Sequence, residues 1–271
     1  MWTSISWVGG TSFEGTSSPS TTATAISPSP PTTGKDKDRF VRRLFDAISP
    51  RYDLFNRLAS LGLDQGWRRR AVAGLRISPG MRVLDLASGT GDLAAAAAEP
   101  LVPLGQVVAC DLSHPMLRFA RRKLGSIPPA RWHVKLTQAR AEALPFSDRT
   151  FHAATLGFAL RNVSDLDATF LELHRVLKAG GRIALLEFGR PRSPLLKVGH
   201  RLWLSLAVPA IGLLTTGRLW PFLYLRRSIL QFLEPAEVLR RLEGAGFRLA
   251  EALPFNGGIV VVYQAEAARR P

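Results

Sequence analysis

The sequence predicts an α/β protein with a parallel sheet and helices on both faces. Short apolar runs alternate with helical segments through the middle of the chain, and a glycine-rich loop follows the first run. Such alternation is typical of βαβ units, whose crossover helices cover a parallel sheet. The 271 residues are 46% hydrophobic, enough for a large core. This composition excludes a disordered chain, and the single cysteine, Cys110, excludes a disulfide-stapled one.

The chain is basic, with 36 Lys and Arg against 21 Asp and Glu and a net charge of +15. Thirty of the basic residues are arginines, and they are spread along the chain. A scattered surplus is weaker evidence for nucleic acid than a patch would be. The charge therefore favours a role in solubility, with an anionic membrane or RNA as the alternatives.

The first 34 residues differ from the rest of the chain. They contain sixteen Ser or Thr and four Pro, and Glu14 is their only charged side chain. Such a stretch buries too little apolar surface to fold, and no Lys or Arg precedes Lys35, whereas transit peptides normally carry arginine. A disordered tail is therefore expected rather than an organelle targeting peptide.

Three helices are expected next. Apolar residues at helical spacing over 40–48 predict an amphipathic helix that ends at Ser49-Pro50. A second helix is expected through Leu54–Leu61, and a third runs from Gln65 into the arginines 68–70. These helices would form an N-terminal cap.

Strands and helices then alternate. The expected strands are Arg82–Leu86, Val107–Cys110, Trp132–Leu136, Phe151–Phe158, Arg182–Phe188 after a Gly180-Gly181 turn, Phe247–Leu253 and Gly258–Tyr263, and the expected helices are Leu93–Ala98, Met116–Leu124, Ala168–Leu177 and one opened by Glu234-Pro235. The alternation is interrupted after Phe188 for about 45 residues rich in Leu, Trp, Pro and Arg. The expected division is a tail 1–34, an N-terminal helical cap 35–78, a core 79–188, an apolar helical insertion 189–233 and a C-terminal part of the core 234–271.

The loop after the first strand predicts a cofactor site. It contains Gly89 and Gly91, which permit tight turning and close approach of a ligand to the backbone. Ligands bind at the carboxyl ends of the strands in such sheets. Asp111, twenty residues after Gly91, ends the second strand, where a carboxylate can accept both hydroxyls of a ribose. An adenosine-containing cofactor follows.

The charges around the loop favour S-adenosylmethionine over a dinucleotide. Asp85 and Asp92 flank the loop and would repel a pyrophosphate. S-adenosylmethionine has no phosphate, and its ammonium would pair with Asp85. Its carboxylate would lie at the helix N-terminus near Asp92. The alternative is that both aspartates only cap the turn.

At this point the chain resembles the ubiquinone/menaquinone biosynthesis C-methyltransferases over about residues 38–264. The sharpest segments are the opening Arg51-Tyr52-Asp53 with Asn56, and Phe158-Ala159-Leu160-Arg161-Asn162-Val163. The others are Phe45–Pro50, Asp85–Leu93, Ala141–Phe146, Arg175–Gly181, Leu186–Phe188 and Gly257–Val260, of which Ala141–Phe146 and Arg175–Gly181 are common to many small-molecule methyltransferases.

The resemblance implies a Rossmann-like class I methyltransferase with a mostly parallel seven-stranded sheet. It implies S-adenosylmethionine-dependent methylation of a ring carbon of a polyprenylated quinol, with demethylmenaquinol favoured and the ubiquinone benzoquinol precursor left open. The cofactor contacts that it implies are Thr90, Asp111, the pair Arg140-Ala141, and Gly157, which join Asp85, Gly89 and Gly91 from the loop itself. The chain departs from the family at two of these positions: the family generally has Asn or Asp at the position of Arg140 and Ser at the position of Gly157. A guanidinium group only donates hydrogen bonds, so Arg140 cannot accept from the adenine amino group as Asn or Asp would.

Carbon methylation of a quinol requires alignment and a more nucleophilic ring. Loss of the phenolic proton, whose reference pKa in tyrosine is about 10, moves electron density onto the ring carbon. Arg161 is the leading candidate to stabilise the phenolate, although an arginine cannot accept the proton. A water held by Arg161 and Asn162 could accept it. Tyr52 is the third candidate, because in resembling enzymes the N-terminal helices fold over the cofactor. No metal motif is present, and the five histidines show no ligand spacing.

The insertion suggests contact with a membrane. The uncharged stretch between Arg201 and Arg218 is 16 residues long and contains Pro209 and Gly212, too short and too broken for the roughly 20 residues of a spanning helix. Trp203, Trp220 and flanking arginines suit either an interfacial surface or a prenyl pocket. The expected location is therefore cytoplasmic, at the inner face of an anionic membrane.

Two other functions are compatible with parts of the sequence. The charge of +15 allows an RNA methyltransferase, but no RNA-binding module is present and Cys110 lies inside a strand, so no nucleic acid partner is expected. A cofactor-binding scaffold without activity follows if Arg140 disables the site. Oligomeric state, including a homodimer, is left open.

Overall fold

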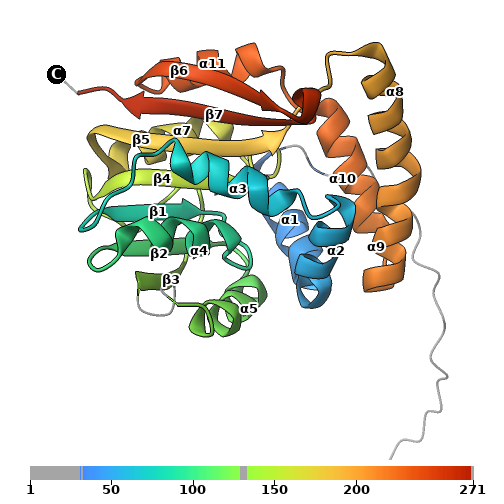
Figure 1. The fold of residues 1–271 in the computed structure, drawn as a ribbon, viewed down its shortest axis with the longest axis horizontal. Helices are drawn as coiled ribbons and strands as arrows, with labels where there is room; N and C mark the ends of the chain where they lie inside the picture. Colours follow the sequence, from blue (N-terminus) through green and yellow to red (C-terminus); the bar gives the residue numbers. More distant parts are fainter. Residues whose placement is uncertain (1–30, 32, 129–132, 270–271) are drawn as a thin grey trace, which may run out of the picture.

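Seven strands form the centre of the protein, as the computed structural model in Figure 1 shows. The described residues are 31, 33–128 and 133–269, so most of the expected N-terminal tail and Trp132 lie outside them. The strands are β1 Arg82–Leu86, β2 Gln106–Asp111, β3 Val134–Gln138, β4 Phe151–Gly157, β5 Leu177–Phe188, β6 Phe247–Phe255 and β7 Val260–Ala267.

The strand order is β3-β2-β1-β4-β5-β7-β6. The strands from β3 to β5 pair in parallel, whereas β7 runs antiparallel to both β5 and β6. The α/β class and the mostly parallel seven-stranded sheet are therefore confirmed. From β1 the chain adds β2 and β3 on one side and then continues with β4 and β5 on the other. This reversal of strand order places a crevice at the carboxyl ends of β1 and β4, which is where ligands bind in such sheets.

Helices cover both faces of the sheet. The helices are α1 Gly34–Ile48, α2 Tyr52–Ala59, α3 Asp64–Ala73, α4 Asp92–Ala98, α5 His114–Gly125, α7 Leu166–Val176, α8 Pro194–Leu202, α9 Val208–Thr216, α10 Trp220–Gln231 and α11 Pro235–Gly244. Residues of α7 and α11 share one apolar core with the sheet, and residues of α3, α4 and α5 share the other. The two cores follow from the alternation along the strands: Leu84 belongs to the first and Val83 to the second.

A third apolar cluster holds together helices from distant parts of the sequence. Leu44 of α1 and Phe55 of α2 pack with Val208, Phe222 and Ile229 of the insertion. We call the helices of residues 34–59 and 194–231 the helical cover; Figure 1 shows them beside one end of the sheet. The helix α3, which the sequence grouped with the N-terminal cap, packs on the sheet instead, because Trp67, Ala71 and Val72 present an apolar face to it.

Some boundaries differ from the sequence prediction. The helix α2 ends at Ala59, so Leu61 lies in a turn with φ 53°. The turn at Gly180-Gly181 lies within β5, which begins at Leu177 and shifts register against β4 between Phe151 and Ala153.

The greatest difference is in the insertion, where Pro194–Thr216 form one continuous helix of 23 residues. Pro209 lies in the first turn of α9, where its missing N–H is tolerated, and a π-helical turn, Trp203–Ala207, precedes α9. Gly212 allows close packing, because a Cβ there would lie 2.1 Å from Phe222 Cδ2. By length and composition this helix is sufficient to cross a membrane, with a mean hydropathy of 1.3 and only 28% of its most apolar stretch buried. The expected break at Pro209 and Gly212 is therefore wrong.

Candidate functional site

A small cavity of about 90 Å³ lies between α1 and the carboxyl ends of the central strands. Five of the sequence-predicted cofactor residues line it: Gly89, Asp111, Arg140, Ala141 and Gly157. Asn162, a predicted catalytic residue, also lines it. The structure thus brings together residues from the loops after β1, β2, β3 and β4, as the topology requires.

The carboxylate of Asp111 is held in a fixed orientation at this cavity. Its Oδ2 accepts a hydrogen bond from Gly89 N at 2.8 Å, and its Oδ1 accepts one from Ser113 N at 2.8 Å. Burial raises the pKa of Asp111 to about 6. The carboxylate is therefore ionised at neutral pH and available to accept from a pair of hydroxyl groups.

Glycines keep the walls of the cavity thin. Gly89 in the wall, and Gly91, which lines neither of the two main cavities, have φ of 55° and 87°, a region that costs other residues strain. A Cβ on Gly157 would lie 2.6 Å from Leu93 Cδ1. The Gly157 position thus has little room for a side chain on that side.

Asp85 and Thr90 do not line either of the two main cavities. Asp85 is fully buried, its Oδ1 accepts from Thr155 Oγ1 at 2.7 Å, and its Oδ2 has no partner. Burial raises the pKa of Asp85 to about 7. The structure places this carboxylate away from the cavity wall, so its contact with an ammonium group stays a prediction.

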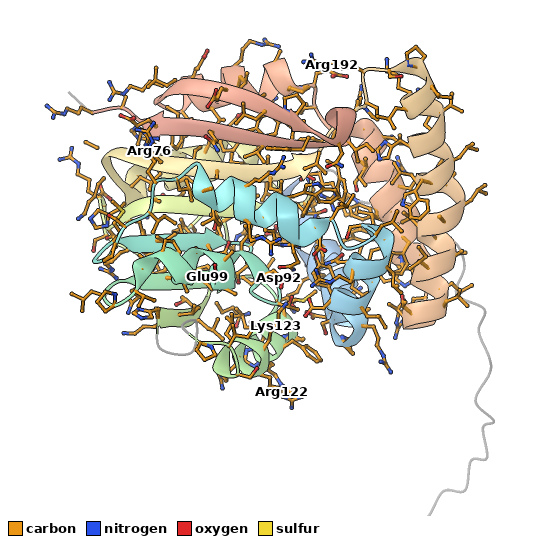
Figure 2. The ribbon with its side chains drawn as sticks, in the orientation of Figure 1. Arg76, Asp92, Glu99, Arg122, Lys123 and Arg192 are labelled. Atoms are coloured by element: carbon orange, nitrogen blue, oxygen red, sulfur yellow. The ribbon has the colours of Figure 1, made fainter. Side chains whose placement is uncertain are left out.

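The hydroxyl of Thr90 connects the loop to the helical cover. It donates to Asp53 Oδ1 of α2 at 2.5 Å. Lys123 of α5 bridges Asp53 Oδ2 at 2.9 Å and Asp92 Oδ1 at 2.5 Å, and Figure 2 shows Lys123 and Asp92 next to each other. Asp46 of α1 accepts from Ser113 Oγ at 2.6 Å. Thr90 therefore contacts the cover that closes over the cavity.

Arg140 has a similar role in the structure. Its Nη2 lies 2.7 Å from Asp38 Oδ2 of α1, and its Nε lies 3.7 Å from Glu142 Oε2. The guanidinium group therefore pairs with α1. The backbone of Arg140-Ala141 is left to contact a ligand.

A large cavity of about 300 Å³ lies between the sheet and the helical cover. Its walls are mostly apolar, from residues such as Ile48, Phe55, Leu204 and Ile229. The two cavities share four wall residues, which mark where they meet: Phe45, Tyr52, Phe158 and Asn162. The two cavities are therefore neighbours, with these side chains at their common boundary.

Arg161 supplies a fixed cation to the large cavity. Its side chain is 7% exposed, and its Nη1 donates to Glu187 Oε1 at 2.5 Å and to Phe158 O at 2.8 Å. Its guanidinium carbon lies 5.2 Å from the centre of the Phe188 ring. Arg161 Nε is buried and has no hydrogen-bond partner. One donor of this guanidinium group is therefore free.

Asn162 and Tyr52 flank Arg161 on the cavity wall. Asn162 Oδ1 accepts from Tyr224 Oη at 3.2 Å, and burial raises the pKa of both Tyr52 and Tyr224. These phenols are therefore donors at neutral pH. All three sequence-predicted catalytic residues line the large cavity, whereas Tyr224 and His200 were missed, since nothing in their local sequence distinguishes them. Among the described residues no group of His, Cys, Asp and Glu could hold a metal ion.

The outer surface of the insertion is apolar. Leu195, Val198, Leu202, Leu206 and Leu214 are exposed, from 55% to 85%. Trp220 is 40% exposed. Trp203, which the sequence suggested as a surface anchor, is turned inward: its Nε1 donates to Ala59 O at 3.2 Å and it lines the large cavity.

Comparison with known proteins finds relatives from one family. The model of the ubiE/COQ5 methyltransferase family matches residues 32–266. The ubiquinone/menaquinone biosynthesis C-methyltransferase UbiE of Syntrophotalea carbinolica is 42% identical, over 82% of this chain and 92% of its own. The UbiE of Geotalea uraniireducens is 36% identical, over 85% and 97%. The demethylmenaquinone methyltransferase of Deinococcus radiodurans is 39% identical, over 79% and 87%.

Solved structures of lower identity share the fold. A SAM-dependent methyltransferase from Aquifex aeolicus superposes with a TM-score of 0.56 at 18% identity, over 74% of this chain and 89% of its own. The [4+2]-cyclase SpnF gives a TM-score of 0.64 at 16% identity, over 90% and 100%. At these identities the likeness concerns the fold alone.

Proposed function

Because the chain belongs to the ubiE/COQ5 methyltransferase family, we propose that its small cavity binds the cofactor and that its large cavity binds the quinone precursor that is methylated. The protein is an S-adenosylmethionine-dependent C-methyltransferase of quinone biosynthesis. The favoured reaction converts demethylmenaquinol to menaquinol, the activity in the names of two relatives, with the benzoquinol precursor of ubiquinone as the alternative.

The small cavity carries polar groups that suit the adenosine part of the cofactor. The oriented carboxylate of Asp111 would accept from the ribose hydroxyls, and the thin walls at Gly89 and Gly157 admit the ligand close to the backbone. Ala141 would contact the adenine. When bound, S-adenosylmethionine supplies an electrophilic methyl group, which is carried on its sulfonium sulfur. The cofactor contains no phosphate.

The ring of the quinol would bind where the cavities meet. Tyr52, Phe158 and Asn162 line both cavities, so a ring beside them faces the cofactor. Alignment of this kind supplies roughly 7–11 kcal/mol of the barrier reduction. Arg161, on the wall of the large cavity, would donate to the quinol oxygen and stabilise the phenolate. The rest of the large cavity is apolar, as a prenyl chain requires.

The protein would collect this substrate at a membrane surface. A polyprenyl quinol resides in the bilayer, and the exposed leucines of residues 195–227 lie on the outside of the cavity wall. Arginines 201, 218, 226 and 227 stand beside these leucines, and each is worth about 1 kcal/mol near anionic headgroups. We propose peripheral binding to an anionic membrane on its cytoplasmic side.

The observation that carries this function is the junction of an Asp111-lined cavity with an apolar cavity that contains Arg161. The test incubates the purified chain with methyl-labelled S-adenosylmethionine and reduced short-chain demethylmenaquinol. Mass spectrometry should find one label on the naphthoquinol ring. Absence of label from both this substrate and the benzoquinol precursor would refute the proposal.

A further inference from the structure

His200 is a buried histidine without a partner. It lies on α8, is 9% exposed, and forms part of the wall of the large cavity. Among the described residues, none forms a hydrogen bond or an ion pair with its ring. Leu196 and Trp203 on the same side of the helix line the same cavity. A buried polar group usually has a partner, so an open ring nitrogen at a cavity wall points to a ligand.

The reaction needs a proton acceptor that Arg161 cannot provide. The other titratable groups on the wall of the large cavity, within the described chain, are Tyr52, Asp64, Arg68 and Tyr224. Burial raises the pKa of both tyrosines, so they remain protonated. Asp64 is already paired with Arg57 at 3.0 Å and Arg68 at 2.5 Å. Among the titratable side chains on the wall of the large cavity in the described chain, His200 is the group that remains.

We propose that His200 is the proton acceptor for the hydroxyl of the quinol, an assignment that rests on the proposed function. In this proposal Arg161 stabilises the negative charge on the quinol oxygen, and the imidazole of His200 accepts the hydroxyl proton. The residue lies on the insertion and not on the sheet. The acceptor is therefore in place only when the helical cover encloses the substrate.

The electrostatic surroundings suit this role. Burial lowers the pKa of His200, so the imidazole is neutral at pH 7 and can accept a proton. The groups that share the cavity with it are Tyr52 of α2, Asp64 and Arg68 of α3, Arg161, and Tyr224 of α10; on its own helix, Lys197 and Arg201 are exposed. Asp64 and Arg68 neutralise each other, and Glu187 neutralises Arg161.

The step balances without another reactant. The hydroxyl proton passes to a ring nitrogen of His200, and the ring carbon forms a bond to the methyl group. The carbon–sulfur bond breaks with its electron pair on sulfur. The ring carbon then loses its hydrogen as a proton to water, which restores aromaticity, and the phenolate recovers a proton from His200. One proton is released for each methyl group transferred.

The first test compares His200→Gln and His200→Asn with Lys197→Gln, an exposed change on the same helix. General-base catalysis contributes roughly 10²–10⁴-fold, so kcat should fall by that factor while KM and the Kd for S-adenosylhomocysteine change less than about threefold. The acidic limb of the kcat profile should vanish, and higher pH should restore part of the rate. A wild-type pH profile in both His200 variants would overturn the assignment.

The second test needs no turnover. Nitrogen-15 NMR measures the chemical shifts of the labelled histidine ring nitrogens in wild type bound to S-adenosylhomocysteine and short-chain demethylmenaquinol. The His200 signal is the one that is lost in His200→Gln. The quinol should shift the unprotonated ring nitrogen upfield, and the oxidised quinone, which has no hydroxyl, should not. Equal shifts from both would overturn the assignment even if the variants fold poorly. Failure of wild type to methylate the quinol refutes the proposed function, whereas methylation with an unchanged His200 signal refutes only this inference.

Discussion

Replacement of Glu187 by alanine should be among the most destabilising single changes in the core. Glu187 is fully buried, and its carboxylate accepts from Arg161 Nη1 at 2.5 Å, from Phe188 N at 2.8 Å and from Arg161 N at 3.3 Å. Removal of one partner from a buried ion pair costs about 3–5 kcal/mol, because the other charge is left unpaired. We expect a loss of this size, which corresponds to a fall in Tm of roughly 6–20 °C.

Urea unfolding followed by circular dichroism measures the change in the free energy of unfolding. The matched control is Glu234→Ala, which removes an ion pair with Arg190 between two half-exposed side chains. Exposed pairs contribute about 0–1 kcal/mol, so this variant should unfold close to wild type. The double variant of Glu187 and Arg161 to apolar residues should recover part of the loss, because no charge is left buried.

A loss below about 1 kcal/mol in Glu187→Ala would refute this reasoning. It would mean that water reaches Arg161 and solvates it, so that the guanidinium group is not held by the carboxylate. In that case the fixed cation proposed for the quinol oxygen would also lose its physical basis.

Three further predictions concern the cofactor, the reaction and the membrane. Asp111→Asn should weaken S-adenosylhomocysteine binding by about 1.5–3 kcal/mol. At pH values below about 6 the wild-type affinity should decrease, because the Asp111 carboxylate, whose pKa is raised, gains a proton there. Calorimetry from pH 5 to 8 measures both effects. Arg161→Ala should lower kcat by roughly 10²–10³-fold with little change in cofactor affinity, and higher pH should partly rescue it; a defect confined to cofactor binding would contradict the role. Intact protein should float with anionic liposomes at low salt and dissociate at high salt, and binding unaltered by charge reversal of arginines 201, 218, 226 and 227 would exclude the proposed surface.

The sheet was predictable because buried parallel strands are short apolar runs with sharp ends. The first strand matches its prediction, Arg82–Leu86, residue for residue. The cofactor loop was equally readable, because Gly89 and Asp111 lie at strand ends that the topology brings together. Local pattern decides these features, so they do not depend on distant partners.

Features that depend on distant partners were not predictable. The ion pair of Asp38 with Arg140 and the hydrogen bond of Thr90 with Asp53 join residues far apart in sequence, and no local signal marks them. From the sequence alone Gly212 indicates a break in the helix, whereas the structure shows that a glycine is needed there for close packing against Phe222. His200 reads as an ordinary histidine, and only its buried place on the wall of the large cavity gives it a chemical role.

The strengths of these contacts suggest which part of the site moves. Glu187 and Arg161 are buried with the sheet, whereas Lys123 and Asp53, which tie the cover to the core, have side chains 23% and 42% exposed. Such partly exposed pairs are weak. The cover itself has an apolar core that includes Leu44, Phe55 and Phe222. We therefore predict that the cover opens as one unit rather than coming apart, and that a prenylated substrate enters without disturbing the residues that hold Arg161.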